Sequence, residues 1–374
     1  MKRAFLSLLH ALYRTARPLI FQFQSDTVHE FFVGVGDCIG KFPPCRAALR
    51  AAVRVKDVSL TQDIHGIRFE NPIGLAAGFD YRARLPEILP SIGMGFGTVG
   101  TITNQAYEGN PKPRLGRLVR SRSLLVNKGF KNDGVDALVR QRKNSRFAIP
   151  IGLSLGKTNR KEPMSQEEAV ADVEEVFQKA IAARLPFAYY ELNISCPNLY
   201  GNVSFYPPEE LRKLLVAVSA ENPDKPIFVK MPISEGNNQT REMLSVLSNF
   251  PAVKGVIFGN LLKDRSNPAF IKDEIENAGR GNFSGAPNFD RSNELISLAY
   301  QEYRGRFTVI GCGGVFRAED AYRKIRLGAS LIQMITGMVF EGPQLPAQIN
   351  QDLVRLLKRD GFKNISEAIG VDNK

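Results

Sequence analysis

From residue 71 onward, short apolar segments alternate with amphipathic ones, and this alternation limits the possible folds more than any other feature. The strand-like segments are 71–78, 97–103, 151–156, 189–195, 226–232, 255–260, 307–314 and 330–336. Helical patterns lie between them, among them 135–143, 165–183, 208–220, 291–303 and 318–327. Near-continuous apolar strands separated by helices predict a parallel sheet covered on both faces. Eight such strands predict an α/β fold, the (β/α)8 or TIM barrel, with an active site at the carboxyl ends of its strands.

The first seventy or so residues do not follow this rhythm. Residues 1–51 are basic and carry aromatic clusters ahead of the pair Pro43-Pro44. This pattern predicts two or three short amphipathic helices and a turn. Residues 58–69 alternate well enough for a hairpin that caps the closed end of the barrel. We therefore divide the chain into an N-terminal helical extension, 1–55, and a catalytic barrel, 56–374.

The composition is that of a soluble globular protein, with 43% hydrophobic and 24% charged residues. No stretch reaches the roughly 18 uninterrupted apolar residues of a spanning helix. A secretory signal is a poor interpretation, because Arg14 and Arg17 interrupt the apolar region. Lys and Arg exceed Asp and Glu by 12, which favours anionic partners such as phosphate groups or acidic lipids. Nucleic acid is not favoured, because the positive residues are spread along the whole chain.

Cysteine and histidine restrict the possible chemistry. The four cysteines form no CxxC pair and no metal-ligand spacing, so we predict no metal site and a reducing compartment. The three histidines all precede the first barrel strand; they are His10, His29 and His65. A general base inside the barrel must then be a cysteine, lysine, tyrosine or carboxylate, or a hydroxyl acting through a relay.

The segment 189–198 brings polar groups to the end of an apolar, aromatic run. Two carboxamides and the thiol of Cys196 follow this run directly, as in a buried strand that delivers side chains to an active site. Pro197 prevents the strand from continuing, so the thiol is expected at a fixed turn.

Glycines at two adjacent strand ends, 311–314 and 336–337, predict a phosphate site, because backbone N–H groups can approach an anion there. The small residues 76–78 would let a flat ring lie against the backbone, and Lys230 points a cation into the same mouth. A phosphate-bearing flat ring beside a lysine suggests flavin mononucleotide, FMN. Lys230 could instead form a Schiff base, as in an aldolase, but that alternative leaves the thiol and the asparagines unexplained.

At this point the chain resembles the dihydroorotate dehydrogenases, over residues 19–345. The motifs are NPIGLAAGFD at 71–80, GNPKPRLGRL at 109–118, NISCPN at 193–198, FSGAP at 283–287, VIGCGG at 309–314 and QMITGMVFEGP at 333–343. The segments 19–24 and 29–31 resemble the helical preface of the membrane-associated, quinone-dependent class, where it forms a hydrophobic tunnel to the flavin.

The resemblance implies a flavoprotein of pyrimidine (UMP) biosynthesis that oxidises dihydroorotate to orotate and passes the electrons to a quinone. Cys196 would be the base that removes the C5 proton while hydride leaves C6 for the flavin. The implied substrate-binding residues are Asn127, Asn193, Asn198 and Asn260. The implied FMN contacts are Ala76, Ala77, Gly78, Thr101, Lys230, Ser284, Gly285, Gly313, Gly314, Thr336 and Gly337. At the quinone end the resemblance nominates His29 and Arg117, and it implies peripheral contact with a membrane, at the cytoplasmic face of a bacterial inner membrane.

The chain also departs from the family pattern. Quinone-dependent members usually carry serine at the position of Cys196, and the usual Asp-Lys pair is replaced by Asp80-Tyr81. The segment 126–130 is one residue shorter than usual, and Ile335 replaces a common tyrosine. Loss of the lysine leaves the substrate open, with Arg82 and Lys128 as the nearest replacement cations. The alternatives are an FMN oxidoreductase acting on another substrate, and a flavin-binding homologue with little turnover.

Overall fold

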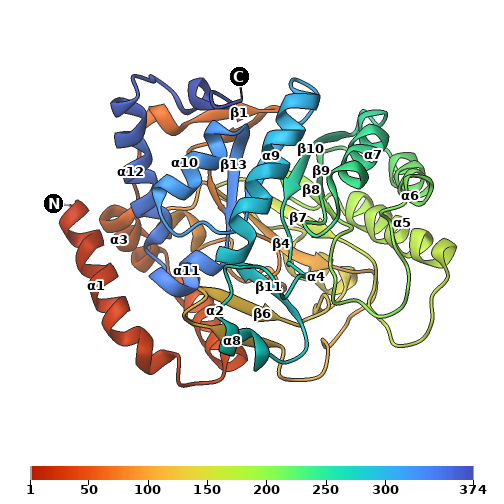
Figure 1. Cartoon of the computed structure of the whole chain (residues 1–374), viewed down its shortest axis with the longest axis horizontal. Helices are drawn as coiled ribbons and strands as arrows, with labels where there is room; N and C mark the ends of the chain where they lie inside the picture. The colour runs from red at the N-terminus through yellow and green to blue at the C-terminus, as the bar shows by residue number, and fades with distance from the viewer. Residues whose placement is uncertain (1, 374) are drawn as a thin grey trace.

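The computed structural model describes residues 2–373, and its core is a closed barrel of eight parallel strands (Figure 1). Each strand pairs with the next barrel strand along the chain, and the last pairs with the first. The strands are β3 (Ile73–Leu75), β4 (Phe96–Ile102), β7 (Ile151–Leu155), β8 (Tyr189–Asn193), β9 (Ile227–Lys230), β10 (Val253–Phe258), β12 (Thr308–Cys312) and β13 (Ala329–Met334). The predicted (β/α)8 barrel is confirmed.

Most strands are shorter than the apolar segments that predicted them. The segment 71–78 contains only three strand residues, and the segment 307–314 contains five. The residues beyond the last paired position turn away from the ladder and line a cavity at the mouth of the barrel. The residues past the strand ends are apolar or small because they form the wall of the cavity.

Helices surround the barrel and bury one apolar stripe each. The surrounding helices are α4 (Val135–Arg142), α5 (Gln166–Ala182), α6 (Pro208–Ala220), α7 (Asn237–Ser248), α9 (Phe289–Tyr303), α10 (Ala318–Arg326) and α12 (Leu345–Arg359). In α5 the capping residue Ser165 accepts from the backbone N–H of Glu168, whose side chain accepts from the Ser165 backbone. The buried residues of α5 recur at spacings of three and four, so one face packs against the sheet.

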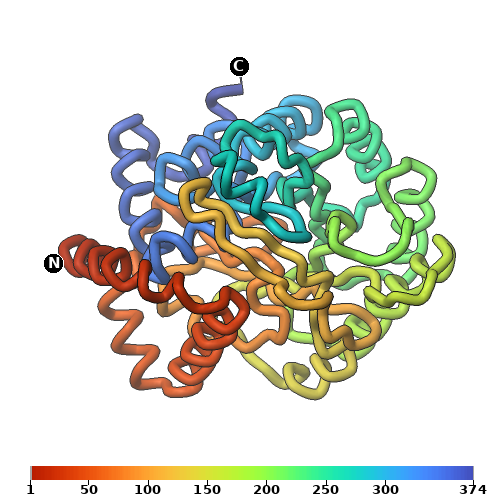
Figure 2. The backbone as a smooth tube through the Cα atoms, turned by 60° about the horizontal axis from the view of Figure 1, so that its bottom comes forward, coloured from red at the N-terminus to blue at the C-terminus, as the bar shows by residue number. Residues whose placement is uncertain are grey.

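The N-terminal extension forms three helices, α1 (Lys2–Ile20), α2 (Ser25–Lys41) and α3 (Pro43–Val53). The first two are longer than predicted, at 19 and 17 residues. Figure 2 shows α1 and α2, in red, beside the gold hairpin of β5 (Leu115–Leu118) and β6 (Ser123–Val126). Leu6 of α1 is 1% exposed and packs with Val53 and Ala347, which ties α1 to α3 and α12.

The predicted hairpin at the closed end is confirmed as β1 (Gln62–Ile64) and β2 (Ile67–Phe69), which pair antiparallel. It lies under the amino ends of the last strands, because Gln62 Nε2 donates to the Ser330 carbonyl at 2.8 Å and His65 Nε2 lies 3.0 Å from Thr308 Oγ1. The hairpin therefore closes the barrel opposite the cavity.

A second sheet was not predicted. It consists of β5 (Leu115–Leu118), β6 (Ser123–Val126) and β11 (Asn282–Gly285), with β6 in the centre and all pairs antiparallel. Short helices α8 (Lys272–Glu276) and α11 (Thr336–Glu341) complete the fold, with single 3-10 turns at Val58–Leu60, Leu89–Ile92, Ala286–Asn288 and Ile365–Ala368. The second sheet forms part of the wall of the same cavity, through Leu115, Leu124 and Val126.

Candidate functional site

A cavity of about 730 Å³ joins the carboxyl ends of the barrel strands to the N-terminal helices. Its barrel end is lined by polar and small residues, among them Thr101, Asn193, Cys196, Lys230, Asn260 and Gly313. Its other end is lined by apolar residues of α1, α2 and α3, among them Leu9, Leu12, Val28, Phe32, Val35 and Leu49. One continuous space therefore has a polar half and an apolar half.

The glycine-rich ends of β12 and β13 present free backbone donors to this cavity. Among residues 2–373, nothing accepts a hydrogen bond from the backbone N–H of Gly313, Gly314, Thr336 or Gly337. Gly313 and Gly314 have φ of 107° and 71°, and a Cβ on Gly337 would overlap the Val315 carbonyl oxygen. Adjacent unpaired N–H groups at positions that require glycine form a suitable cradle for an anion such as a phosphate.

Lys230 ends β9 and is 4% exposed, yet its ammonium has no hydrogen-bond acceptor within the described part of the chain. The nearest charge is Glu191 Oε1, at 3.6 Å from Lys230 Nζ. A buried ammonium carries three donors that need acceptors. Because Lys230 lines the cavity, its free donors are available to a bound molecule.

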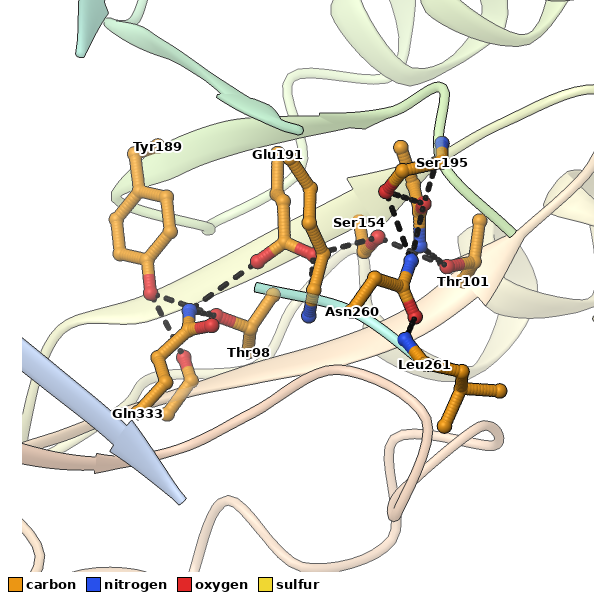
Figure 3. A network of polar contacts seen from close by, with 12 residues as sticks. Thr98, Thr101, Ser154, Tyr189, Glu191, Ser195, Asn260, Leu261 and Gln333 are labelled. Carbon is orange, nitrogen blue, oxygen red and sulfur yellow. Dashed lines mark hydrogen bonds and ion pairs between the residues drawn. The ribbon is translucent and has the colours of Figure 1, made fainter. Parts of the chain in front are cut away.

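A buried network of hydrogen bonds holds the Glu191 side chain in place (Figure 3). Its side chain is fully buried, and it accepts from Ser154 Oγ and from Gln333 Nε2, each at 3.2 Å. Gln333 Nε2 also donates to Thr98 Oγ1 at 3.0 Å. The network ties β4, β7, β8 and β13 together and fixes the carboxylate that faces the lysine. Sequence analysis missed this role, and the available signal was a carboxylate inside an otherwise apolar strand.

Three of the four predicted asparagines meet at the mouth of the barrel. Asn193 Nδ2 donates to Thr101 Oγ1 at 2.8 Å. Asn260 Nδ2 donates to Ser195 Oγ at 2.8 Å, as Figure 3 shows. Asn193, Asn198 and Asn260 all line the cavity. This cluster offers several amide donors and acceptors to one small polar ligand.

Asn127 lies apart from the other three asparagines, because it follows β6 of the second sheet and not a barrel strand. It borders a separate cavity of about 690 Å³ and is absent from the lining of the main cavity. Its Oδ1 accepts from Asn110 Nδ2 at 2.9 Å, and the same nitrogen donates to the Asn198 carbonyl at 2.9 Å. Asn110 thus links Asn127 to the cluster, and its place in the motif 109–118 was the available sequence signal.

Cys196 lines the cavity, but its surroundings oppose ionisation. Burial raises the pKa of the thiol to about 11, against the smaller opposing effects of the Asn198 backbone N–H and the ammonium groups of Lys230 and Lys157. An ordinary thiol has a pKa of about 8.5 and would ionise readily as a base. In the folded protein the Cys196 thiol is instead protonated near neutrality.

His29 and Arg117 both line the cavity at its apolar half. His29 is half-buried, and its loss of hydration lowers its pKa to about 4, with a further effect from the ammonium of Lys128. Its Nε2 lies 2.8 Å from the Phe79 carbonyl, so Nε2 carries the proton and Nδ1 accepts from Lys128 Nζ at 3.4 Å. Arg117 Nη1 donates to the Phe21 and Phe23 carbonyls at 3.2 and 2.9 Å. The guanidinium is therefore held against the loop between α1 and α2.

The cations that could replace the missing lysine lie in different places. Arg82 forms an ion pair with Asp133 at 2.9 Å and does not line the cavity. Lys128 does line it, with Nζ 4.6 Å from the centre of the Tyr81 ring. The Tyr81 hydroxyl donates to the carboxylate of Glu30. Only one of the two candidate cations, Lys128, is therefore available to a ligand.

Two further features bear on the class of site. Among residues 2–373 there is no group of three or more His, Cys, Asp or Glu side chains that could hold a metal ion. None of the described helices combines the length and the apolar character needed to cross a membrane.

Comparisons with known proteins agree with these observations. A sequence profile of the family "Dihydroorotate dehydrogenase" matches residues 59–357. The chain is 32% identical to "Dihydroorotate dehydrogenase (quinone)" of Natronomonas pharaonis, covering 96% of this chain and 99% of the relative. It is 36% identical to the protein of the same description in Trichodesmium erythraeum, covering 85% of each. A solved structure of ligand-free DHODH from Eimeria tenella aligns with a TM-score of 0.81 at 25% identity, over 92% of this chain and 98% of that one.

Proposed function

This chain belongs to the dihydroorotate dehydrogenase family, and from that premise we propose that it oxidises dihydroorotate to orotate with FMN as cofactor and a quinone as electron acceptor. The observation that carries the proposal is the single cavity with two chemically different halves. A polar, anionic substrate suits the asparagine cluster at one end. A hydrophobic acceptor suits the helix-lined end, so both can reach a cofactor held between them.

Several features support FMN. The phosphate would be held by the free N–H groups of Gly313, Gly314, Thr336 and Gly337. The ring would lie along 76–78, where a Cβ on Gly78 would meet nothing within 4 Å, and near Thr101 and Ser284-Gly285. Bound there, FMN supplies the group that accepts two electrons from the substrate and returns them to the acceptor. Lys230 would neutralise the negative charge that develops on the reduced ring.

The chain's own residues would then perform the proton chemistry and the orientation. Asn193, Asn198 and Asn260 can donate to and accept from the alternating C=O and N–H edges of a cyclic ureide. Asn127 would act on this cluster through Asn110. Cys196 would remove the substrate proton. Because its thiol is protonated in the free protein, the thiolate would have to form when the substrate displaces water beside Lys230 and Lys157.

At the apolar half, a quinone would enter between α1 and α2. His29 and Arg117 lie on that wall. The guanidinium of Arg117 would donate to a carbonyl oxygen of the quinone head, and the imidazole ring of His29 would pack against it. The extension 1–55 would serve as the quinone and membrane region, and residues 56–374 as the catalytic unit.

The extension also carries exposed apolar side chains, which favours peripheral contact with a membrane. Leu19, Phe23 and Phe31 are 62%, 61% and 64% exposed, and Arg3 and Arg14 lie exposed on the same extension. Apolar side chains together with cations are the usual means of binding an anionic lipid surface. We propose that the protein lies at the cytoplasmic face of a bacterial inner membrane, as the resemblance to the quinone-dependent class implies.

One observation favours a second candidate, an FMN oxidoreductase of this family with a different substrate. The bulky Tyr81 lines the cavity where the family pattern has lysine, and its hydroxyl is bound to Glu30. The candidates differ in one measurement, which is whether dihydroorotate reduces the bound flavin.

The test uses the purified full-length protein. We expect it to retain FMN without a covalent bond and to be reduced by dihydroorotate under anaerobic conditions. Gly313→Asp should lose FMN, because the carboxylate repels the phosphate and crowds its cradle. Gly305→Asp is the matched control, since Gly305 also has a positive φ of 80° but lies in open space. A protein that cannot take up FMN would exclude both candidates, and a flavin that dihydroorotate fails to reduce would exclude the first.

A further inference from the structure

Lys128 stands where the polar and apolar halves of the cavity meet. Its side chain comes from the segment after β6 and approaches α2 and the loop after β3. Lys128 Nζ lies 3.4 Å from His29 Nδ1 and 4.6 Å from the centre of the Tyr81 ring. Within residues 2–373 no carboxylate oxygen lies within ion-pair distance of this nitrogen. The ammonium therefore has donors available to a molecule in the cavity.

Apart from Lys131, whose ammonium is paired with Glu30 at 3.7 Å, the groups beside Lys128 offer no transferable proton to the cavity. His29 directs its N–H to the Phe79 carbonyl, and Tyr81 directs its O–H to Glu30. The guanidinium of Arg117 does not release protons in proteins. The titratable and charged groups that face Lys128 are Asp26, His29 and Glu30 of α2, Tyr81, Arg114 and Lys131.

We propose that Lys128 is the proton donor to the quinone when the reduced flavin is reoxidised. The inference rests on the proposed function and deepens it. Reduction of a quinone to a quinol takes up two electrons and two protons. Both electrons and one proton come from the reduced cofactor, and the second proton comes from the Lys128 ammonium, which becomes a neutral amine. Water at the rim, where the Glu30 side chain is 42% exposed, then restores the ammonium.

The environment of Lys128 suits this role. Burial lowers the pKa of its ammonium to about 8 from the ordinary value near 10.5, and the carboxylates of Asp26 and Glu30 limit the fall. A proton donor works best when its pKa lies near the operating pH. An exposed lysine would release its proton more reluctantly.

The position of Lys128 favours the quinone over the substrate as its partner. Its contacts are with His29 and Tyr81, beside α2, whereas the asparagine cluster contacts Thr101 and Ser195 at the barrel strands. A lysine that served the substrate would be expected to share contacts with that cluster.

The experiment separates the two half-reactions. FMN-loaded enzyme is reduced by light, so that this step does not depend on dihydroorotate, and is then mixed anaerobically with decylubiquinone. We expect Lys128→Met to slow flavin reoxidation by roughly 10²-fold, which is typical for loss of a general acid. Lys128→Arg should be slowed similarly while its apparent affinity for the quinone stays near wild type, because it keeps the charge but cannot release the proton.

Wild-type reoxidation should be fast below pH 8 and should slow by about tenfold per pH unit above the Lys128 pKa of about 8, and both variants should lose this dependence. Lys131→Met is the matched control, because Lys131 also lies over the Tyr81 ring, at 5.2 Å, but is paired with Glu30. It should reoxidise at the wild-type rate. Wild-type reoxidation in Lys128→Arg, or a loss confined to flavin reduction by dihydroorotate, would overturn the inference while leaving the proposed function intact.

Discussion

Cys196 must lose a proton before it can take one from a substrate, and burial in the cavity wall opposes that loss. We expect Cys196→Ala to retain FMN but to lose about 10²- to 10⁴-fold in anaerobic flavin reduction by dihydroorotate, because general base catalysis is worth that much. The flavin-reduction rate of Cys196→Ser should fall between those of the wild type and Cys196→Ala, since a hydroxyl needs a relay to act as a base. Reduction of the alanine variant at the wild-type rate would exclude the cysteine as base.

The same residue sets the expected pH dependence. The catalytic form is the thiolate, and kcat/KM reports ionisation in the free protein. The kcat/KM of flavin reduction should therefore rise with pH toward about 11, where the thiol ionises. A plateau reached near pH 8.5, the ordinary thiol range, would show that burial does not control this group.

At the scale of the element, His29 of α2 contacts the Phe79 carbonyl, and the folded protein favours the neutral form of this histidine. The pKa of His29 is about 4 in the folded protein and about 6.5 in an unfolded chain. A lowered histidine pKa contributes stability that is complete above about pH 6.5 and is lost as pH falls toward about 4.

We expect the wild type to lose about 2 kcal/mol more unfolding free energy than His29→Gln between pH 7 and pH 5. Urea unfolding at the two pH values measures the difference, and the comparison cancels groups common to both proteins, such as the buried Asp80. His65→Gln is the control, because His65 is more exposed and should keep most of the wild-type loss. Equal losses in wild type and His29→Gln would contradict the assignment.

The sequence predicted those elements whose signal is local. Apolar runs predicted the barrel strands, and alternation of apolar and polar residues predicted the hairpin 58–69. The second sheet escaped because β11 pairs with β6 although more than 150 residues separate them, and neither strand is long enough for a periodic pattern. The position of Asn127 outside the barrel was missed for the same reason, because this residue follows β6.

Within the site, the sequence identified groups by chemistry but not by environment. Cys196, Lys230 and the glycine ends all line the cavity as predicted. The raised pKa of Cys196, the buried partner Glu191 and the neutral state of His29 depend on packing between distant segments, which composition and spacing do not record.

For the whole molecule, the exposed apolar side chains of the extension predict where it meets a membrane. Replacing Leu19, Phe23 and Phe31 together with serine should weaken binding to anionic vesicles by at least about tenfold, because each side chain buries apolar surface in lipid. None of the three lines the cavity, so flavin reduction should stay at the wild-type rate. Val58→Ser is the control in the same flotation assay, since Val58 is 79% exposed beside the hairpin at the closed end. Unchanged flotation of the triple variant would remove the membrane assignment.

The cavity has one wall from the barrel and the second sheet and one from α1 to α3, and the three helices precede all the other lining residues along the chain. Substitutions in the first fifty or so codons can reshape the acceptor's half without touching the residues that face the donor. The helices can therefore change the choice of electron acceptor independently of the chemistry on the substrate, and a lineage could exchange one quinone for another while inheriting an unaltered oxidation site.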